Sequence, residues 1–133
     1  RKFDNSGFEK IFFQKKNKIT FLSFGYTTKI VFKYLKEMKI FDNVNLIDCY
    51  KLKPFNRKKL IPLIKNSKKI IIVEEHISSN GLKSIFLENM HDLIKGIEVE
   101  SIGIDNQKFY NYGDHDFMIN KYINIHKKIE RFL

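Results

Sequence analysis

The chain has 133 residues, of which 43% are hydrophobic, and it carries a formal net charge of +10 at pH 7. That length suits a single domain spanning residues 1–133. The one cysteine, Cys49, excludes an intrachain disulfide and a cysteine-based zinc site, and it favours a reducing compartment, so we expect a cytoplasmic protein. No apolar run is long enough to cross a bilayer, so we expect no membrane contact.

The positive charge has a simpler explanation than nucleic-acid binding. Lysines account for 22 of the 25 basic residues, and the chain is rich in Ile, Phe and Asn but has no Ala or Trp. This is the bias of AT-rich codons, under which Lys is the default surface residue. The lysines, including the pair Lys68 and Lys69, are scattered rather than clustered with arginine and aromatic residues, so we expect no nucleic-acid partner.

Strand-like and helix-like segments alternate along the chain. Short apolar runs indicate strands, and apolar residues repeated every three or four positions indicate helices. In chain order we expect strands at 8–14 and 19–24, a helix at 27–39, a strand at 44–49, a helix at 57–65 capped by Asn56, a strand at 70–74, a helix at 81–95, a strand at 98–104 and short helices at 116–122 and 124–132. This alternation predicts an α/β fold with right-handed crossovers and helices on both faces of the sheet.

The first helix follows a strand that stops at Gly25. A dinucleotide-binding turn needs three glycines at fixed spacing, so this single glycine favours a plain tight turn. Thr27 or Thr28 is expected to cap the helix with its hydroxyl group. The backbone N–H groups at such a helix start can also hold an anion.

The segment Glu74-Glu75-His76 closes the most apolar strand. Consecutive strand residues point to opposite faces, so the two glutamates cannot share a metal ion without a bend, and no histidine pair has metalloprotease spacing. An acid or base here would lie at the carboxyl end of a central strand, where open α/β sheets bind ligands. The simpler alternative is that one glutamate caps or pairs with a neighbouring loop and the other is solvated. At the end of another strand, Cys49 is expected to be a buried, inert thiol.

Four segments, in order, resemble the C-terminal domain of the transketolase family of thiamine-diphosphate enzymes. The first is KITFLSFG at 18–25. The second is VNLIDCYKLKPFN at 44–56, in which Asp48, Leu52, Lys53 and Pro54 match the family pattern. The others are KKIIIVEEHISSNGLKS at 68–84 and SIGIDNQKFYNYGDHDFMINKYIN at 101–124.

The chain departs from the family pattern at three places. Asn80 and Lys83 stand where glycines are usual, and Ile123-Asn124 replaces a glycine turn. Asparagine tolerates left-handed backbone conformations, so Asn80 is a mild change. Lys83 would imply a looser contact with a partner domain or subunit.

The resemblance implies a three-layer α/β/α unit. Its mixed five-stranded sheet has the order 1-3-2-4-5 with strand 1 antiparallel. The strands that end at Gly25 and Glu74 would be neighbours whose connections leave in opposite directions, which creates a crevice at a topological switch point. Tyr26, Thr27 and Thr28 would line one side of this crevice, and Glu75 and His76 the other.

The implied function belongs to a larger enzyme. The chain begins at Arg1 without Met, so we expect a domain of a longer chain or a subunit of a transketolase-like transferase that moves ketol groups between sugar phosphates. Thiamine diphosphate and magnesium would bind between its pyrophosphate-binding and pyrimidine-binding domains, and the whole enzyme would be a homodimer or higher oligomer. The resemblance assigns no catalytic, cofactor-binding or metal-binding residue to this chain.

Other interpretations remain open at the level of the sequence. A 2-oxo-acid dehydrogenase β subunit and a deoxyxylulose-phosphate synthase share this type of domain. A stand-alone α/β module that binds a small anion at the switch point, and a basic nucleic-acid-binding domain, are alternatives from different classes.

Overall fold

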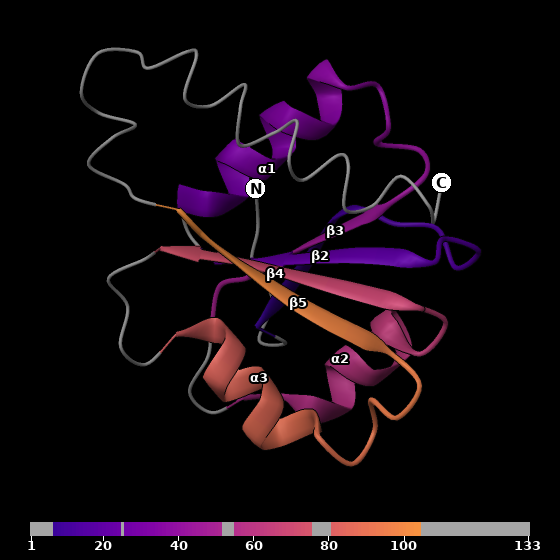
Figure 1. Ribbon diagram of the computed structural model, residues 1–133, viewed down its shortest axis with the longest axis vertical. Helices are drawn as coiled ribbons and strands as arrows, with labels where there is room; N and C mark the ends of the chain where they lie inside the picture. The colour runs from indigo at the N-terminus through magenta and orange to yellow at the C-terminus, as the bar shows by residue number, and fades with distance from the viewer. Residues whose placement is uncertain (1–6, 25, 52–54, 76–80, 105–133) are drawn as a thin grey trace.

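Five strands and three helices make up the described part of the chain (Figure 1). The computed structural model describes residues 7–24, 26–51, 55–75 and 81–104. In chain order the elements are β1 (Phe8–Phe12), β2 (Ile19–Ser23), α1 (Tyr26–Glu37), β3 (Asn45–Cys49), α2 (Arg57–Ile64), β4 (Lys69–Glu75), α3 (Leu82–Met90) and β5 (Glu98–Ile104). The helices expected at 116–122 and 124–132 lie outside the described residues.

The sheet has the order β1-β3-β2-β4-β5, with β1 antiparallel to β3 and the other neighbours parallel. This confirms the expected order and the antiparallel first strand. Helix α1 covers one face, and α2 and α3 cover the other, so the fold is a three-layer α/β/α arrangement (Figure 1). Because both faces are covered, every residue of β2 and β3 is buried, which explains their nearly continuous apolar sequence.

Each face of the sheet carries its own hydrophobic core. Side chains that alternate along the strands divide between the two, so Phe21 and Ile71 pack with α1, whereas Leu22 and Ile72 pack with α2 and α3. Among the described residues, Tyr34 of α1 is the largest fully buried side chain, and burial raises the pKa of its hydroxyl group.

A bulge in the edge strand β1 sends its two ends to opposite faces of the sheet. Lys10 pairs with Ile47 and Phe12 with Leu46, so the register shifts by one residue between them. A shift of one residue moves all later side chains to the other face. Phe8 therefore packs in the core beneath α2 and α3, whereas Phe12 packs on the α1 side.

Helix α1 ends at Glu37, and two residues later Lys39 has a left-handed conformation that stops it. Lys39 has φ of 58°, the backbone N–H of Ile40 donates to the carbonyl of Leu35 (3.2 Å), and that of Lys39 donates to the carbonyl of Lys36 (3.2 Å). These two bonds form the motif that commonly stops a helix, in which the left-handed position is usually glycine.

Helix α3 ends at Met90, five residues before the expected boundary at residue 95. Arg57 of α2 donates to the carbonyl of Asn89 (3.2 Å) and forms a two-pronged ion pair with Asp92 (3.0 and 2.8 Å). These bonds tie the end of α3 to the start of α2 and divert the chain into turns. The hydrogen bond from Arg57 lowers the pKa of Asp92, so this contact is lost as pH falls through that lowered pKa.

The interpretation of Lys69 as a surface lysine was wrong. Its side chain is 1% exposed, and its Nζ lies 3.2 Å from an oxygen of Glu100 and 3.7 Å from one of Glu98. Both glutamates are on β5, the strand beside β4, and a buried cation requires such partners. This ion cluster joins β4 to the edge strand β5.

Within the described ranges, no helix combines the length and hydrophobicity that a membrane-spanning helix requires.

Replacing Lys39 by glycine should stabilise the fold. The left-handed conformation costs a residue with a Cβ about 1–2 kcal/mol, and glycine removes this cost. Glycine also has a larger entropy in the unfolded state, which cancels part of the stabilisation. We expect Lys39→Gly to raise the free energy of unfolding by about 0.5–1 kcal/mol. Urea denaturation followed by circular dichroism measures this change.

Lys65→Gly is the matched control, because Lys65 ends α2 in a right-handed conformation with φ of −59°. That change should destabilise by about 0.5–1 kcal/mol. Equal effects of the two substitutions would contradict the assigned strain at Lys39.

Candidate functional site

The centre of the sheet has the topology of a ligand-binding switch point. β2 and β4 are parallel neighbours. The chain leaves β2 through α1 towards β3, and it leaves β4 through α3 towards β5 (Figure 1). The two connections therefore run towards opposite edges of the sheet, and their helices cover opposite faces. In open α/β sheets the space outside the carboxyl ends of two such strands is the usual place for a ligand.

Thr27 joins the end of β2 to the end of β4. Its hydroxyl oxygen accepts the backbone N–H of Phe24 (3.1 Å). The single hydroxyl proton points between the carbonyls of Phe24 (2.9 Å) and Val73 (3.1 Å). Thr27 is fully buried, so this group holds two strand ends together and is not presented to solvent.

Thr28 belongs to a buried chain of polar groups under the start of α1. Its hydroxyl donates to Asp48 of β3 (2.7 Å) and lies 2.6 Å from the hydroxyl of Ser23. Because the proton of Thr28 points to the carboxylate, the Ser23 hydroxyl donates to Thr28. The three side chains are buried, with exposures of 0%, 6% and 5% for Ser23, Thr28 and Asp48.

The expectation that Thr27 or Thr28 caps α1 was wrong, because the helix already begins at Tyr26 and both threonines lie in its first turn. Their hydroxyls instead satisfy strand ends and Asp48. The sequence analysis did not predict this network. Asp48 could have indicated it, since a carboxylate within a buried strand requires hydrogen-bond donors nearby.

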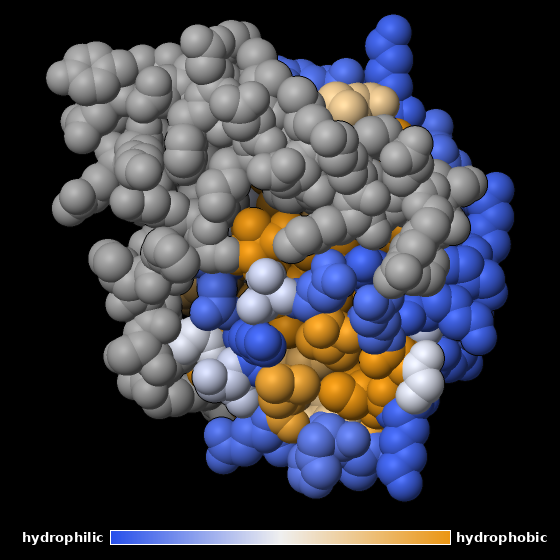
Figure 2. Space-filling view, in the orientation of Figure 1, coloured by the Kyte–Doolittle hydropathy of each residue, from blue (hydrophilic) through white to orange (hydrophobic). Residues whose placement is uncertain are grey.

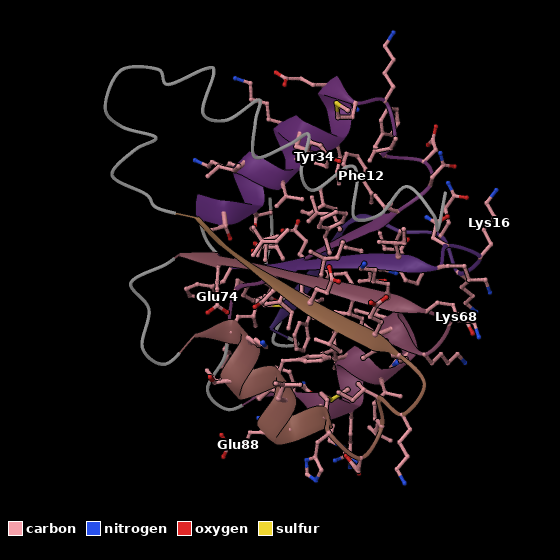
Figure 3. All side chains as sticks on the ribbon, in the orientation of Figure 1. Phe12, Lys16, Tyr34, Lys68, Glu74 and Glu88 are labelled. Carbon is pink, nitrogen blue, oxygen red and sulfur yellow. The ribbon has the colours of Figure 1, made fainter. Side chains whose placement is uncertain are left out.

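Glu74 caps α3 from the neighbouring strand. Its carboxylate accepts the backbone N–H of Lys83 (2.8 Å), in the first turn of the helix. Gly81, the residue before the helix, provides no side-chain cap, and a Cβ there would lie 2.8 Å from the carboxyl carbon of Glu74 and closer still to one of its oxygens. Glycine is therefore needed so that the carboxylate of Glu74, labelled in Figure 3, can reach the helix.

The sequence predicted that one glutamate of the Glu74-Glu75-His76 segment caps or pairs with a neighbouring segment. Glu74 does so, because it caps α3. Glu75 ends β4 opposite Ile104 of β5. His76 lies outside the described residues. The predicted crevice between the threonines and the pair Glu75 and His76 stays a prediction.

Both helix starts at the switch point have a carboxylate beside them. Asp48 binds Thr28 in the first turn of α1, and Glu74 binds the first turn of α3. A helix start attracts anions because its N–H groups are unpaired and its dipole is positive there. Negative charge already placed at both starts opposes the binding of a phosphate group.

The described residues do not fit a thiamine diphosphate site. A diphosphate at either helix start would meet the carboxylate of Asp48 or Glu74, which repels it. Among the described residues, no three His, Cys, Asp or Glu side chains gather as a metal-binding group. Cys49 is buried, as expected, and its burial, followed by the charge of Asp48, raises the thiol pKa. A protonated, enclosed thiol is a poor nucleophile.

Neither a protein-family model nor a curated protein matches the sequence. Among solved structures, the chain is similar to one described as a split-gene transketolase from an inactive β4 tetramer. The TM-score is 0.64 at 20% identity, over 93% of this chain and 43% of that chain. The likeness shows a transketolase-like α/β fold. The present chain spans less than half the length of this structural neighbour.

The capping contact predicts a strong coupling between Gly81 and Glu74. Gly81→Ala forces the flexible carboxylate of Glu74 away from the helix start and should destabilise by about 1 kcal/mol, which is the contribution of the lost cap. In a Glu74→Ala background, which itself loses about 1 kcal/mol of capping, the same substitution should be nearly neutral. Urea denaturation of the four proteins in this double-mutant cycle measures the coupling. Additive effects would contradict the contact.

The buried hydroxyl chain predicts a different response to two replacements of Thr28. Thr28→Val keeps the shape but removes the proton donated to Asp48, and we expect a loss of about 1–3 kcal/mol. Thr28→Ser keeps the donor and loses one methyl group, which costs about 0.8 kcal/mol. If serine proved as destabilising as valine in thermal and urea denaturation, the hydrogen bond to Asp48 would not be the cause.

Proposed function

We propose that this chain is the C-terminal domain or subunit of a transketolase-like enzyme that depends on thiamine diphosphate and transfers ketol groups between sugar phosphates. The observation that carries the proposal is the strand order β1-β3-β2-β4-β5 with β1 antiparallel. The four sequence motifs that resemble the family imply this same order. The split-gene transketolase neighbour adds support at the level of the fold.

Within that enzyme the chain has a supporting role and no catalytic residue. Its switch-point groups are committed to internal hydrogen bonds, since Thr27 binds strand carbonyls, Thr28 binds Asp48 and Glu74 caps α3. Thiamine diphosphate and Mg²⁺ would bind to the pyrophosphate-binding and pyrimidine-binding domains, which supply the chemistry. The whole enzyme would be a cytoplasmic homodimer or higher oligomer.

The surface supports association with other domains. Figure 2 shows a hydrophobic area over β5 and the helices beneath it, bordered by hydrophilic residues. On α3, β5 and the segment between them, Leu87, Ile97 and Val99 are partly buried against the core, and Leu93 is 40% exposed. Contiguous apolar surface of this kind is typical of a docking site.

The closely related alternatives use the same domain in the same supporting role. A 2-oxo-acid dehydrogenase β subunit or a deoxyxylulose-phosphate synthase would differ in the catalytic domains. The anion-binding module is less favoured, because Asp48 and Glu74 place negative charge at both helix starts.

Reconstitution with the neighbouring reading frame tests the proposal. We expect the chain alone to bind no thiamine diphosphate in isothermal titration with Mg²⁺ and to have no ketol-transfer activity. Co-expression with the adjacent pyrophosphate-binding and pyrimidine-binding domains should give a stable complex with activity on sugar phosphates. Activity on a 2-oxo acid or on pyruvate with glyceraldehyde phosphate would select one of the related enzymes.

The control is the melting temperature of the isolated chain in the presence of inorganic phosphate. A phosphate-dependent increase would support the anion-binding module, since ligands that bind the folded state raise the melting temperature. Turnover of a ketose phosphate by the chain alone would show that the assigned non-catalytic role is wrong.

A further inference from the structure

Three phenylalanine rings gather around a lysine on the outer side of α1. The rings of Phe12 and Phe32 are stacked, with centroids 5.3 Å apart, and Phe41 lies 5.5 Å from Phe12. The Nζ of Lys36 lies 4.2 Å from the centroid of Phe41, 5.4 Å from that of Phe12 and 5.7 Å from that of Phe32. These distances place the ammonium group within cation–π range of all three rings.

The cluster is assembled from three separate parts of the chain. The bulge in β1 turns Phe12 to the α1 side of the sheet, where Figure 3 labels it, and Phe41 comes from the segment after α1. Without the bulge, the two-residue period of a strand would place Phe12 on the same face as Phe8. The backbone of an edge strand is thus adjusted to bring this ring beside Phe32.

The cluster continues into an exposed stripe of α1. Phe32 is 40% exposed, and the three lysines Lys29, Lys33 and Lys36 are exposed on the same helix. Positions 29, 32, 33 and 36 follow the spacing that puts residues on one face of a helix. One acidic residue, Glu37, is exposed on α1 one turn after Lys33. We name the group of Phe12, Phe32, Phe41, Lys29, Lys33 and Lys36 the aromatic–lysine patch.

We propose that the aromatic–lysine patch docks an acidic, amphipathic segment of another polypeptide, which places an apolar side chain on Phe32 and carboxylates on Lys29, Lys33 and Lys36. An exposed apolar ring beside three lysines, with one glutamate nearby, is complementary to a partner that has apolar residues between acidic ones. The ring cluster holds the ammonium of Lys36 in place before binding, so less side-chain freedom is lost on association. The proposal rests on β1 and α1 and does not require the transketolase-like assignment.

Charge and ring geometry favour this occupant over two others. A second copy of the chain would bring three lysines against three lysines, and like charges at an interface suppress association. Single-stranded nucleic acid needs free ring faces on which bases stack. Here Phe12 and Phe32 are stacked on each other, and the ammonium of Lys36 lies within range of all three rings.

The probe for the test is a fluorescein-labelled synthetic peptide that places leucines between glutamates at helical spacing. Fluorescence anisotropy with the whole chain measures its affinity, and backbone NMR shifts locate the binding site. We expect Phe32→Ala to weaken binding about tenfold, as substitutions at aromatic interface residues do. Lys33→Gln should weaken binding about threefold, as the loss of one exposed ion pair does.

The chain offers a matched control for each variant. Phe24 is 44% exposed, close to the 40% of Phe32, and Lys16 is exposed outside the patch, so Phe24→Ala and Lys16→Gln should leave the affinity unchanged. A peptide with glutamines in place of the glutamates should bind at least tenfold more weakly. Circular dichroism shows whether Phe32→Ala disturbs the fold. If it does, Lys33→Gln still tests the proposal, because Lys33 is exposed and its replacement should leave the fold intact.

The following results would overturn the proposal. Equal effects of Lys16→Gln and Lys33→Gln would show general attraction to a basic protein. NMR shifts confined to elements other than β1 and α1 would place the site elsewhere. Tighter binding of a thymidine oligonucleotide than of the peptide, weakened by Phe32→Ala, would identify nucleic acid as the occupant. The absence of peptide binding at low salt would exclude the acidic segment.

Discussion

β2 and β4 pair in parallel along their whole apolar length, from Ile19 with Lys69 to Ser23 with Val73. Each strand is enclosed by neighbours at both edges and by helices on both faces, so its backbone groups are satisfied by the sheet. The chain leaves the two strands in opposite directions, through α1 to β3 and through α3 to β5. With right-handed crossovers, these directions place α1 on one face, α3 on the other, and the switch point between them.

The polar groups at the ends of these strands complete the constraint. Thr27 bonds to the carbonyl of Val73, so the start of α1 is held against the end of β4. Asp48 and Glu74 reach from β3 and β4 to the starts of α1 and α3. The same groups that make the crossovers rigid also give the switch point a negative charge. The contacts that hold the helix starts in place are therefore also the reason why we expect weak phosphate binding there.

The sequence predicted those features that depend on local periodicity, and it missed those that depend on contacts between distant residues. The strand at Glu98–Ile104 and the cap at Asn56 follow from short-range pattern and were correct. Lys69 was misread because its partners are on β5, about thirty positions later in the chain. The contact of Glu74 with Lys83 crosses from a strand to a helix, and no pattern of alternation contains it. A bulge such as that in β1 likewise depends on the register with β3.

Lys83, which stands where the resembled pattern has glycine, contributes its backbone rather than its side chain to the fold. Glu74 bonds to the backbone N–H of this residue, which every residue type except proline provides. The side chain of Lys83 is partly exposed, so it does not compete with the cap. Gly81 is different, because any Cβ there would meet the carboxylate of Glu74. Of these two positions, the structure restricts side-chain identity at Gly81, where a carboxylate approaches the backbone, and leaves it free at Lys83.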